Sequence, residues 1–431
     1  MSASVRRLCH WGPLAVLCII KLITWAMIHL IGMWWPPHET VGGALHAALF
    51  LFLASSTLYF FLQSLLEGPG FVPFGWKPEN EADTQYLQFC LTCNGYKAPR
   101  SHHCRKCGRC VKKMDHHCPW INSCVGHANH GYFTLFLVSA VLGCLHASIA
   151  LSICLYHAIN RAWYVRHGSG REPRVVVTLA TLLLALLAVG VAVGVVLAVG
   201  ALLYMQVRGI LANKTTIEEW IVEKAAARRA ERGLPPLAFP YRLPWRDSVR
   251  RALTAAGDGL SWPLAPGCHP YDLTCEQLAQ KADKRTRSRL FAARARYGGR
   301  WVPLCSRPRA ALAAPCTDEP RLPLAPGDRV RVTRQRKHWL FGEKLVGGGE
   351  ERGPRGWFPR DAVAPCRRAT SAPVQPVHPC NQCTRASSTP VQPVHPCIQY
   401  TRATSTLVQP VHPCNQCTRA LVNVMTSLIT N

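Results

Sequence analysis

Cysteine and histidine side chains crowd one stretch of the chain, from Phe89 to Leu137. Thiolate sulfur and imidazole nitrogen are the usual ligands of tetrahedral zinc, and the C-x2-C pairs at Cys90 and Cys104 are typical zinc knuckles. Two four-coordinate sites need eight ligands. The sequence therefore predicts two structural zinc ions. Eleven candidate ligands are present, so at least three of them are not needed for zinc. The eleven are Cys90, Cys93, Cys104, Cys107, Cys110, Cys118, Cys124, His102, His103, His116 and His117.

The residues left over include a nucleophile beside a base. A cysteine thiol becomes a nucleophile when a neighbouring base takes its proton and a third group orients that base. His116 lies two positions before Cys118, and Asp115 directly precedes His116. A compact turn would bring the three together as a Cys-His-Asp triad. Because an apolar segment follows closely, we expect a thiolate at a membrane surface, where it can accept a fatty acyl group.

Four long apolar segments predict an α-helical polytopic membrane protein with the cysteine cluster between the second and third. Each reaches the roughly 20 residues that a helix needs to cross a bilayer. A cleaved signal peptide is disfavoured for the first segment, which is too long and lacks a small-residue cleavage site. The expected transmembrane helices are residues 11–35, 41–66, 134–159 and 175–207.

Charge and redox chemistry together predict the orientation. The loop of residues 67–131 holds eight Lys and Arg against five Asp and Glu, a net charge of +3, and the chain after Gln206 is also basic. Both features favour the cytosol. The loop of residues 160–174 holds four arginines and opposes this assignment. Reduced zinc-binding cysteines need a reducing compartment, so we expect the zinc loop and both termini to be cytosolic. The net charge of +27 is then explained without nucleic acid.

The region after the fourth span predicts two helices. Thr215 and Glu218 have the spacing of a capping box, which opens a helix that continues to about Arg232. A Pro- and Gly-rich linker follows to about Tyr271. A second helix, from Thr274 to about Tyr297, is rich in Lys and Arg. It is either a solvated helix or one that lies on anionic lipid headgroups.

Short alternating segments at residues 327–332, 338–345 and 356–363 predict a small β-barrel. Their order resembles a Src-homology-3 (SH3) domain, which implies a groove for a proline-rich or regulatory partner. A barrel without a ligand remains the alternative.

Three 17-residue repeats begin at Val374, Val391 and Val408, and their prolines predict a disordered tail. Tyr400 replaces one repeat cysteine, which argues against metal binding there. The expected domains are transmembrane helices 1 and 2 at 1–66, the zinc domain at 67–133, transmembrane helices 3 and 4 at 134–207, a basic helical and linker region at 208–312, the SH3-like domain at 313–366 and the tail at 367–431.

With these features the sequence resembles the DHHC-family protein S-acyltransferases, from Trp11 to about Trp220. The resemblance implies a catalytic set of Cys118, His116 and Asp115, and it leaves His102 without a role. Thr215, Thr216 and Glu218 match the family's TTxE motif, with Thr216 the expected contact to Asp115. Residues 67–70 stand where the family usually has Asp-Pro-Gly. The implied zinc ligands are Cys90, Cys93, His103 and Cys110 for one ion, and Cys104, Cys107, His117 and Cys124 for the other.

The implied reaction transfers a long-chain acyl group from acyl-CoA to Cys118 and then to a membrane-proximal cysteine of a substrate protein. We expect CoA phosphates to meet basic residues, namely Lys97, Arg100, Lys112 and Lys113. Four spans with an SH3-type domain resemble the family's endoplasmic reticulum member. The resemblance implies a location in the endoplasmic reticulum, with the Golgi as the alternative. A retrieval-type basic terminus is absent from the sequence. The alternative function is a catalytically silent, zinc-containing membrane scaffold.

Overall fold

The computed structural model describes residues 7–366, apart from residues 174, 300–309, 312, 318 and 347–350. The chain forms two compact units, Met1–Asp283 and Lys284–Asn431. The three predicted repeats and the predicted disordered tail lie outside the described residues.

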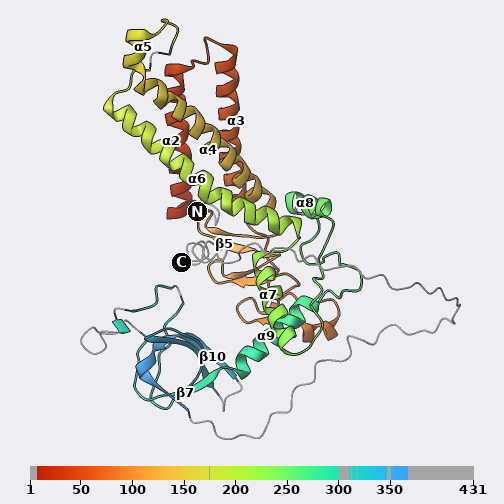
Figure 1. The fold of residues 1–431 in the computed structure, drawn as a ribbon. Helices are drawn as coiled ribbons and strands as arrows, with labels where there is room; N and C mark the ends of the chain where they lie inside the picture. Colours follow the sequence, from red (N-terminus) through yellow and green to blue (C-terminus); the bar gives the residue numbers. More distant parts are fainter. Residues whose placement is uncertain are drawn as a thin grey trace, which may run out of the picture. The chain divides into compact units, whose positions relative to one another are not determined.

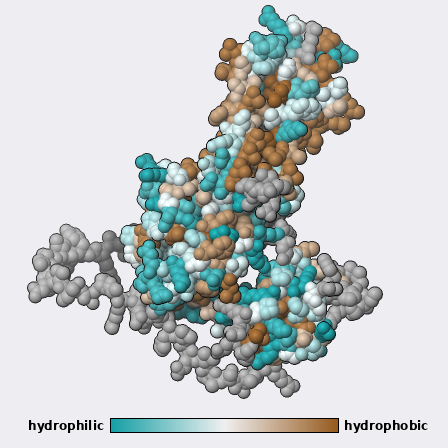
Figure 2. Space-filling view, turned by 180° about the vertical axis from the view of Figure 1, so that it is seen from behind, coloured by the Kyte–Doolittle hydropathy of each residue, from teal (hydrophilic) through white to brown (hydrophobic). Residues whose placement is uncertain are grey.

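Four helices of the first unit are long and apolar enough to cross a membrane, and Figure 1 shows them side by side. They confirm that the four apolar segments are helical, although four boundaries differ from those predicted. The first helix ends one residue early, at Trp34, and the fourth ends four residues late, at Leu211. The third helix begins at His130, and the fourth begins at Leu179 because Thr178 caps it in a capping box with Thr181. Apolar side chains gather over these helices in Figure 2. The four are α2 (Trp11–Trp34), α3 (Val41–Leu66), α4 (His130–Ile159) and α6 (Leu179–Leu211).

Helix α4 is the central member of this group and contacts α2, α3 and α6. Small buried residues such as Gly143, Ala147 and Ala150 line it, and small side chains let helix backbones approach closely in a membrane. The short helix α5 (Arg161–His167) follows α4.

Three consecutive two-stranded hairpins make up the cysteine-rich loop, after the 3-10 helix η1 (Glu81–Tyr86). Strands this short bury too little apolar surface to hold a fold together, so cross-linking by metal is the expected source of stability. The hairpins pair β1 (Phe89–Cys90) with β2 (Gly95–Tyr96), β3 (His102–Cys104) with β4 (Arg109–Val111), and β5 (His116–Cys118) with β6 (Ser123–Val125).

Three helices follow α6: α7 (Thr216–Glu231), α8 (Trp245–Thr254) and α9 (Asp272–Thr286). The predicted capping box at Thr215 and Glu218 is present at the start of α7. Helix α8 lies in the stretch predicted to be a linker. The prediction of a helix to Tyr297 is wrong beyond Thr286, because strand β7 (Arg289–Ala293) begins there and buries Phe291 and Ala293 in a sheet. Packing in the sheet outweighs local helix propensity at this point.

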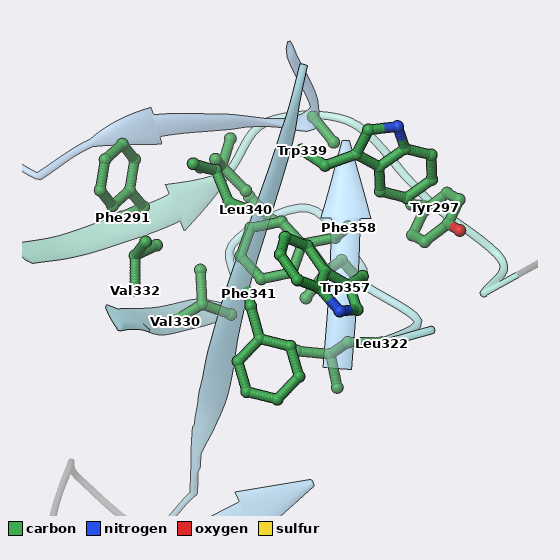
Figure 3. Close-up of a cluster of buried hydrophobic side chains, with 14 of the residues drawn as sticks. Phe291, Tyr297, Leu322, Val330, Val332, Trp339, Leu340, Phe341, Trp357 and Phe358 are labelled. Carbon is green, nitrogen blue, oxygen red and sulfur yellow. The ribbon is translucent and has the colours of Figure 1, made fainter. Parts of the chain in front are cut away.

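The second unit contains a five-stranded antiparallel sheet that joins β7 to β8 (Arg329–Gln335), β9 (Trp339–Val346), β10 (Glu351–Pro359) and β11 (Val363–Pro365). The strand order is β10-β9-β8-β7-β11. Strands β8, β9 and β10 overlap the three predicted segments with shifted bounds, whereas β7 lies within residues 208–312, where helix and linker were expected. Figure 3 shows the sheet's core, in which Trp339, Phe358 and Leu340 are buried. The 3-10 helix η3 (Arg360–Ala362) lies between β10 and β11.

Candidate active site and zinc sites

The eight predicted zinc ligands converge as two groups of four, and within each group the ligand atoms lie within 4.8 Å of one another. In the first group, His103 Nδ1 lies 3.4, 3.5 and 3.8 Å from the sulfurs of Cys90, Cys93 and Cys110. Zinc bound to sulfur at about 2.3 Å and to nitrogen at about 2.0 Å in a tetrahedron separates such atoms by ~3.6 Å.

In the second group, His117 Nδ1 lies 3.6, 3.5 and 3.7 Å from the sulfurs of Cys104, Cys107 and Cys124. These separations match those of the first group. Both sets of residues therefore fit a tetrahedral zinc ion in composition and in spacing.

Strand pairing explains why the ligands divide in this way. His103 lies opposite Cys110 in the β3–β4 hairpin, and His117 lies opposite Cys124 in the β5–β6 hairpin. Cys104, next to His103 on β3, belongs to the other group. Each group therefore joins two successive hairpins, and the three hairpins form one linked series.

Strand alternation also separates the metal chemistry from the reactive pair. Successive side chains of a strand point to opposite faces, so His116 and Cys118 share one face of β5 while His117, between them, occupies the other. One three-residue strand thus presents a candidate zinc ligand, His117, on one side and a thiol with its neighbouring imidazole on the other. This is the arrangement that the Asp-His-His-Cys sequence alone left open.

Asp115 holds His116 by a hydrogen bond, in which Nδ1 of His116 donates to Oδ2 of Asp115 at 2.9 Å. Burial by itself lowers the pKa of His116, but the interactions with Asp115 and Cys118 outweigh burial and raise this pKa to about 10. Burial has the opposite effect on a carboxyl group and raises the pKa of Asp115. The hydrogen bonds from His116 and from Thr216 outweigh burial and hold the pKa of Asp115 well below its usual range. The imidazole is therefore suited to hold the proton that the Cys118 thiol loses.

Cys118 opens onto an apolar cavity between the helices. Cys118 is buried, with 5% of its surface exposed. It lines a cavity of about 350 Å³ together with side chains of α2, α3, α4 and α6, among them Ile23, Phe136 and Val195. This volume lies in the range of ligand pockets, about 300–1,000 Å³. A hydrocarbon chain attached to the sulfur would fit such a lining chemically.

The first turn of α7 also holds Asp115, through the carboxylate oxygen that His116 does not contact. The backbone N–H of Thr216, the first residue of this helix, donates to Oδ1 of Asp115 at 2.6 Å. A carboxylate is stabilised at a helix N-terminus by free N–H groups and by the helix dipole. Thr216 is therefore the contact to Asp115, as expected, and it acts through its main chain.

A buried ion pair fixes the start of α7 to the zinc loop. Arg100 donates to both carboxylate oxygens of Glu218 at 2.6 and 2.7 Å, and both side chains are 0% exposed. The guanidinium lies between the rings of Tyr241 and Trp262, 4.6 and 4.7 Å from their centres. Glu218 also accepts the backbone N–H of Thr215 at 2.9 Å. Planar, always-charged arginine suits such a bidentate, stacked position.

The same network corrects two expected contacts to CoA. Arg100 is occupied by Glu218 and by the carbonyl of Asn213. Lys113 is buried and donates to Oδ1 of Asn213 at 3.1 Å, and burial and the neighbouring Arg100 lower its pKa to about 7. Neither side chain reaches an external phosphate. Lys112 donates to the carbonyl of Asp258 and Lys97 to Gln88, at partly or fully exposed positions.

Several of these supporting residues carry no motif in the sequence. Arg100, Lys113 and Asn213 adopt positive φ angles of 64°, 42° and 47°. Asn213 directly follows Ala212, the C-cap of α6, at the position where a left-handed glycine or asparagine often ends a helix. Asn129 is also buried and joins α3 to β6 through bonds to the carbonyls of Ser64 and Cys124. His102 lies outside both ligand groups, and burial lowers its pKa to about 4.

Comparison with known proteins agrees with this geometry. The family model for the DHHC palmitoyltransferases matches residues 83–223. The chain is 44% identical to human palmitoyltransferase ZDHHC6 over 383 residues, which cover 84% of this chain and 92% of that protein. It is 40% identical to the Danio rerio protein of the same name over 381 residues, with the same coverage. It is 32% identical to probable protein S-acyltransferase 16 of Arabidopsis thaliana over 226 residues, covering 48% of this chain and 75% of that protein. The chain therefore belongs to the DHHC palmitoyltransferase family and is a protein S-palmitoyltransferase.

Proposed function

We propose that this S-palmitoyltransferase forms its acyl-enzyme on Cys118, with His116 as the acid-base group and Asp115 orienting it. One observation carries the proposal. His116 and Cys118 share a face of β5, and Cys118 lines the apolar cavity between the helices. The thiol therefore stands at the junction of a proton acceptor and a site for a hydrocarbon chain.

The first step forms the acyl-enzyme. His116 takes the proton of the Cys118 thiol, the thiolate attacks the thioester carbonyl of a long-chain acyl-CoA, and the carbon–sulfur bond to CoA breaks. His116 returns the proton to the departing CoA thiolate. Asp115 stabilises the imidazolium, and Thr216 keeps Asp115 in place.

The second step runs the same chemistry with a new nucleophile. A cysteine thiol of the substrate protein gives its proton to His116 and attacks the thioester on Cys118. The Cys118 thiolate leaves and recovers the proton. Because the acyl chain lies in the cavity in both steps, accepting cysteines should lie close to the membrane surface.

The two Cys3His groups would hold structural zinc. With all four positions filled by protein, the metal supplies stability and no chemistry. The chain's own contribution is to tie β5 to the β3–β4 hairpin through His117 and to β6 through strand pairing, which limits the movement of His116 and Cys118.

The membrane topology, the location in the cell and the CoA contacts are part of the same proposal. We place four spans in the membrane, with the zinc loop and both termini in the cytosol, and the protein in the endoplasmic reticulum or, second, the Golgi. Lys97 and Lys112 remain the candidates for CoA phosphates. The predicted domain limits stay predictions, except that the limit at residue 313 is wrong for the sheet, because β7 at Arg289–Ala293 belongs to it.

We also propose that the second unit is SH3-like, since its strand order and the 3-10 helix before β11 follow that pattern. Its binding of a proline-rich partner stays a prediction. Trp339, the aromatic that would face such a partner, is buried, and its indole N–H donates to the carbonyl of Ala310 at 2.8 Å.

The test is Cys118→Ser in the full chain, followed with a fatty-acid probe. We expect hydroxylamine-sensitive labelling of the enzyme and of its substrates to disappear while zinc content stays near two per chain. Substrate labelling that survives this substitution would refute the assignment and favour the scaffold alternative.

A further inference from the structure

Helix α8 exposes an apolar stripe on its surface. Trp245 and Leu253 are 59% and 43% exposed. Together with Val249 they recur every four residues and so lie along one side of the helix. Arg246 and Arg250 have the same spacing and form a second exposed stripe beside the first. The face formed by Ser248 and Ala252 is buried.

Contacts with the first unit fix the direction in which the apolar stripe points. Helix α8 packs against α4 and α6 (Figure 1). The carbonyl oxygen of Leu253 lies so close to Gly131, the second residue of α4, that a Cβ there would lie 2.5 Å from it. The turn after α8 is held by His127, which donates to the carbonyl of Gly257 at 3.1 Å. Helix α8 therefore lies at the level where α4 begins.

The order of faces around α8 suits the boundary of a bilayer. At 100° per residue, the buried face is followed by the apolar stripe, then by Arg246 and Arg250, and then by Asp247 and Thr254. The Arg246 guanidinium lies 5.4 Å from the centre of the Trp245 ring. In an interfacial helix, apolar residues enter the acyl boundary, arginines reach the phosphates and acidic residues face water. Tryptophan is also enriched at this depth.

We propose that α8 is a membrane-surface anchor: Trp245 and Leu253 insert at the boundary of headgroups and acyl chains, and Arg246 and Arg250 bind the phosphates of anionic lipids. The proposal rests on the four-span membrane topology put forward above. Because α8 contacts the first turn of α4, which follows directly on the catalytic hairpin, lipid binding here would fix the depth of Cys118 relative to the bilayer. The basic helix expected from Thr274 onward is a different element.

Depth is the direct test. The full chain is reconstituted in lipid nanodiscs with an environment-sensitive fluorescent amino acid at position 245, 253 or, as a control on the same helix, 247. We expect lipids brominated near the headgroup to quench positions 245 and 253, and aqueous iodide to quench position 247. Iodide quenching of position 245 as strong as that of position 247 would overturn the proposal. Weak quenching by both agents at 245 and 253 would also overturn it, since a protein segment or a second copy would then cover the stripe.

Charge is tested separately by native mass spectrometry of the chain purified from mixed phosphatidylcholine and phosphatidylserine. We expect bound phosphatidylserine to fall several-fold in Arg246→Gln/Arg250→Gln but to stay unchanged in Arg289→Gln/Arg329→Gln, which removes two exposed arginines of the second unit. Equal retention in both double variants contradicts the proposal. Acyl-enzyme labelling is measured in parallel. If Cys118 is labelled but phosphatidylserine binding does not depend on Arg246 and Arg250, the anchor alone is refuted. If labelling does not depend on Cys118, the proposed function is refuted.

Discussion

The main-chain N–H of Thr216 donates a 2.6 Å hydrogen bond to Oδ1 of Asp115 across 101 positions of sequence. Asp115 in turn accepts from Nδ1 of His116, so the first peptide unit of α7 is two hydrogen bonds away from the imidazole that we propose as the base for Cys118. The orientation of the proposed reactive pair, His116 and Cys118, therefore depends on where α7 begins.

Thr216→Pro removes this donor while leaving α7 intact. Proline is favoured at the first helical position, and Thr215, with φ −87° and ψ 160°, already has the conformation that precedes proline. Losing a hydrogen bond to a charged group costs about 1.5–3 kcal/mol, so we expect acyl-enzyme formation to slow ~10- to 100-fold. Thr216→Ala keeps the N–H and should remain close to wild type. Equal rates for the two variants in a stopped labelling assay would show that the bond is unimportant.

Breaking the buried Arg100–Glu218 pair should destabilise the first unit. Arg100→Met or Glu218→Gln leaves an uncompensated buried charge or carboxamide, and such losses cost about 3–5 kcal/mol of unfolding free energy. The double variant Arg100→Met/Glu218→Leu should cost less than the sum of the single losses. Thermal unfolding in detergent measures this.

A matched control is the exposed pair Arg208 and Glu219, whose side chains are 64% and 61% exposed. Arg208→Met should change stability by no more than about 1 kcal/mol. Similar melting temperatures for Arg100→Met and Arg208→Met would disagree with a structural role for the buried pair.

Gly12 should tolerate no side chain. A Cβ at this position of α2 would lie 2.8 Å from the carbonyl carbon of Pro119 and 3.1 Å from Cα of Trp120, next to Cys118. Gly12→Ala must push α2 away from the β5–β6 hairpin, and we expect both acyl-enzyme yield and melting temperature to fall. Gly32→Ala is the control on the same helix, since a Cβ there meets nothing within 4 Å. A functional Gly12→Ala enzyme would argue against this close approach.

Removing one zinc ligand should unfold the linked hairpins. Metal binding energy is folding energy in such small elements, so Cys104→Ala should lose at least one zinc per chain, together with activity and protease resistance of the loop. Mass spectrometry of metal content gives the first readout. Cys9→Ser, which changes an exposed cysteine outside both ligand groups, should keep both ions. Full metal content and activity in Cys104→Ala would reject the assigned ligand sets.

The sequence alone identified the eleven candidate ligands and the apolar segments because both depend on local chemistry, and the family resemblance selected eight of the eleven. The knuckles place ligands a few residues apart, and the bilayer requires a continuous apolar run that composition reveals. The Asp115-His116-Cys118 set was also readable, since its members are neighbours in the chain.

Only the tertiary structure decided what the basic residues do and where the C-terminal elements lie. Arg100 has the sequence character of a surface phosphate ligand, yet it lies buried against Glu218, 118 positions away, because two aromatic rings and a helix start enclose it. Residues 289–293 have helical composition but form a strand, since β8 and β11 supply their hydrogen-bond partners. The environment of a charge and the partner of a strand are both set by distant segments, and no local pattern encodes them.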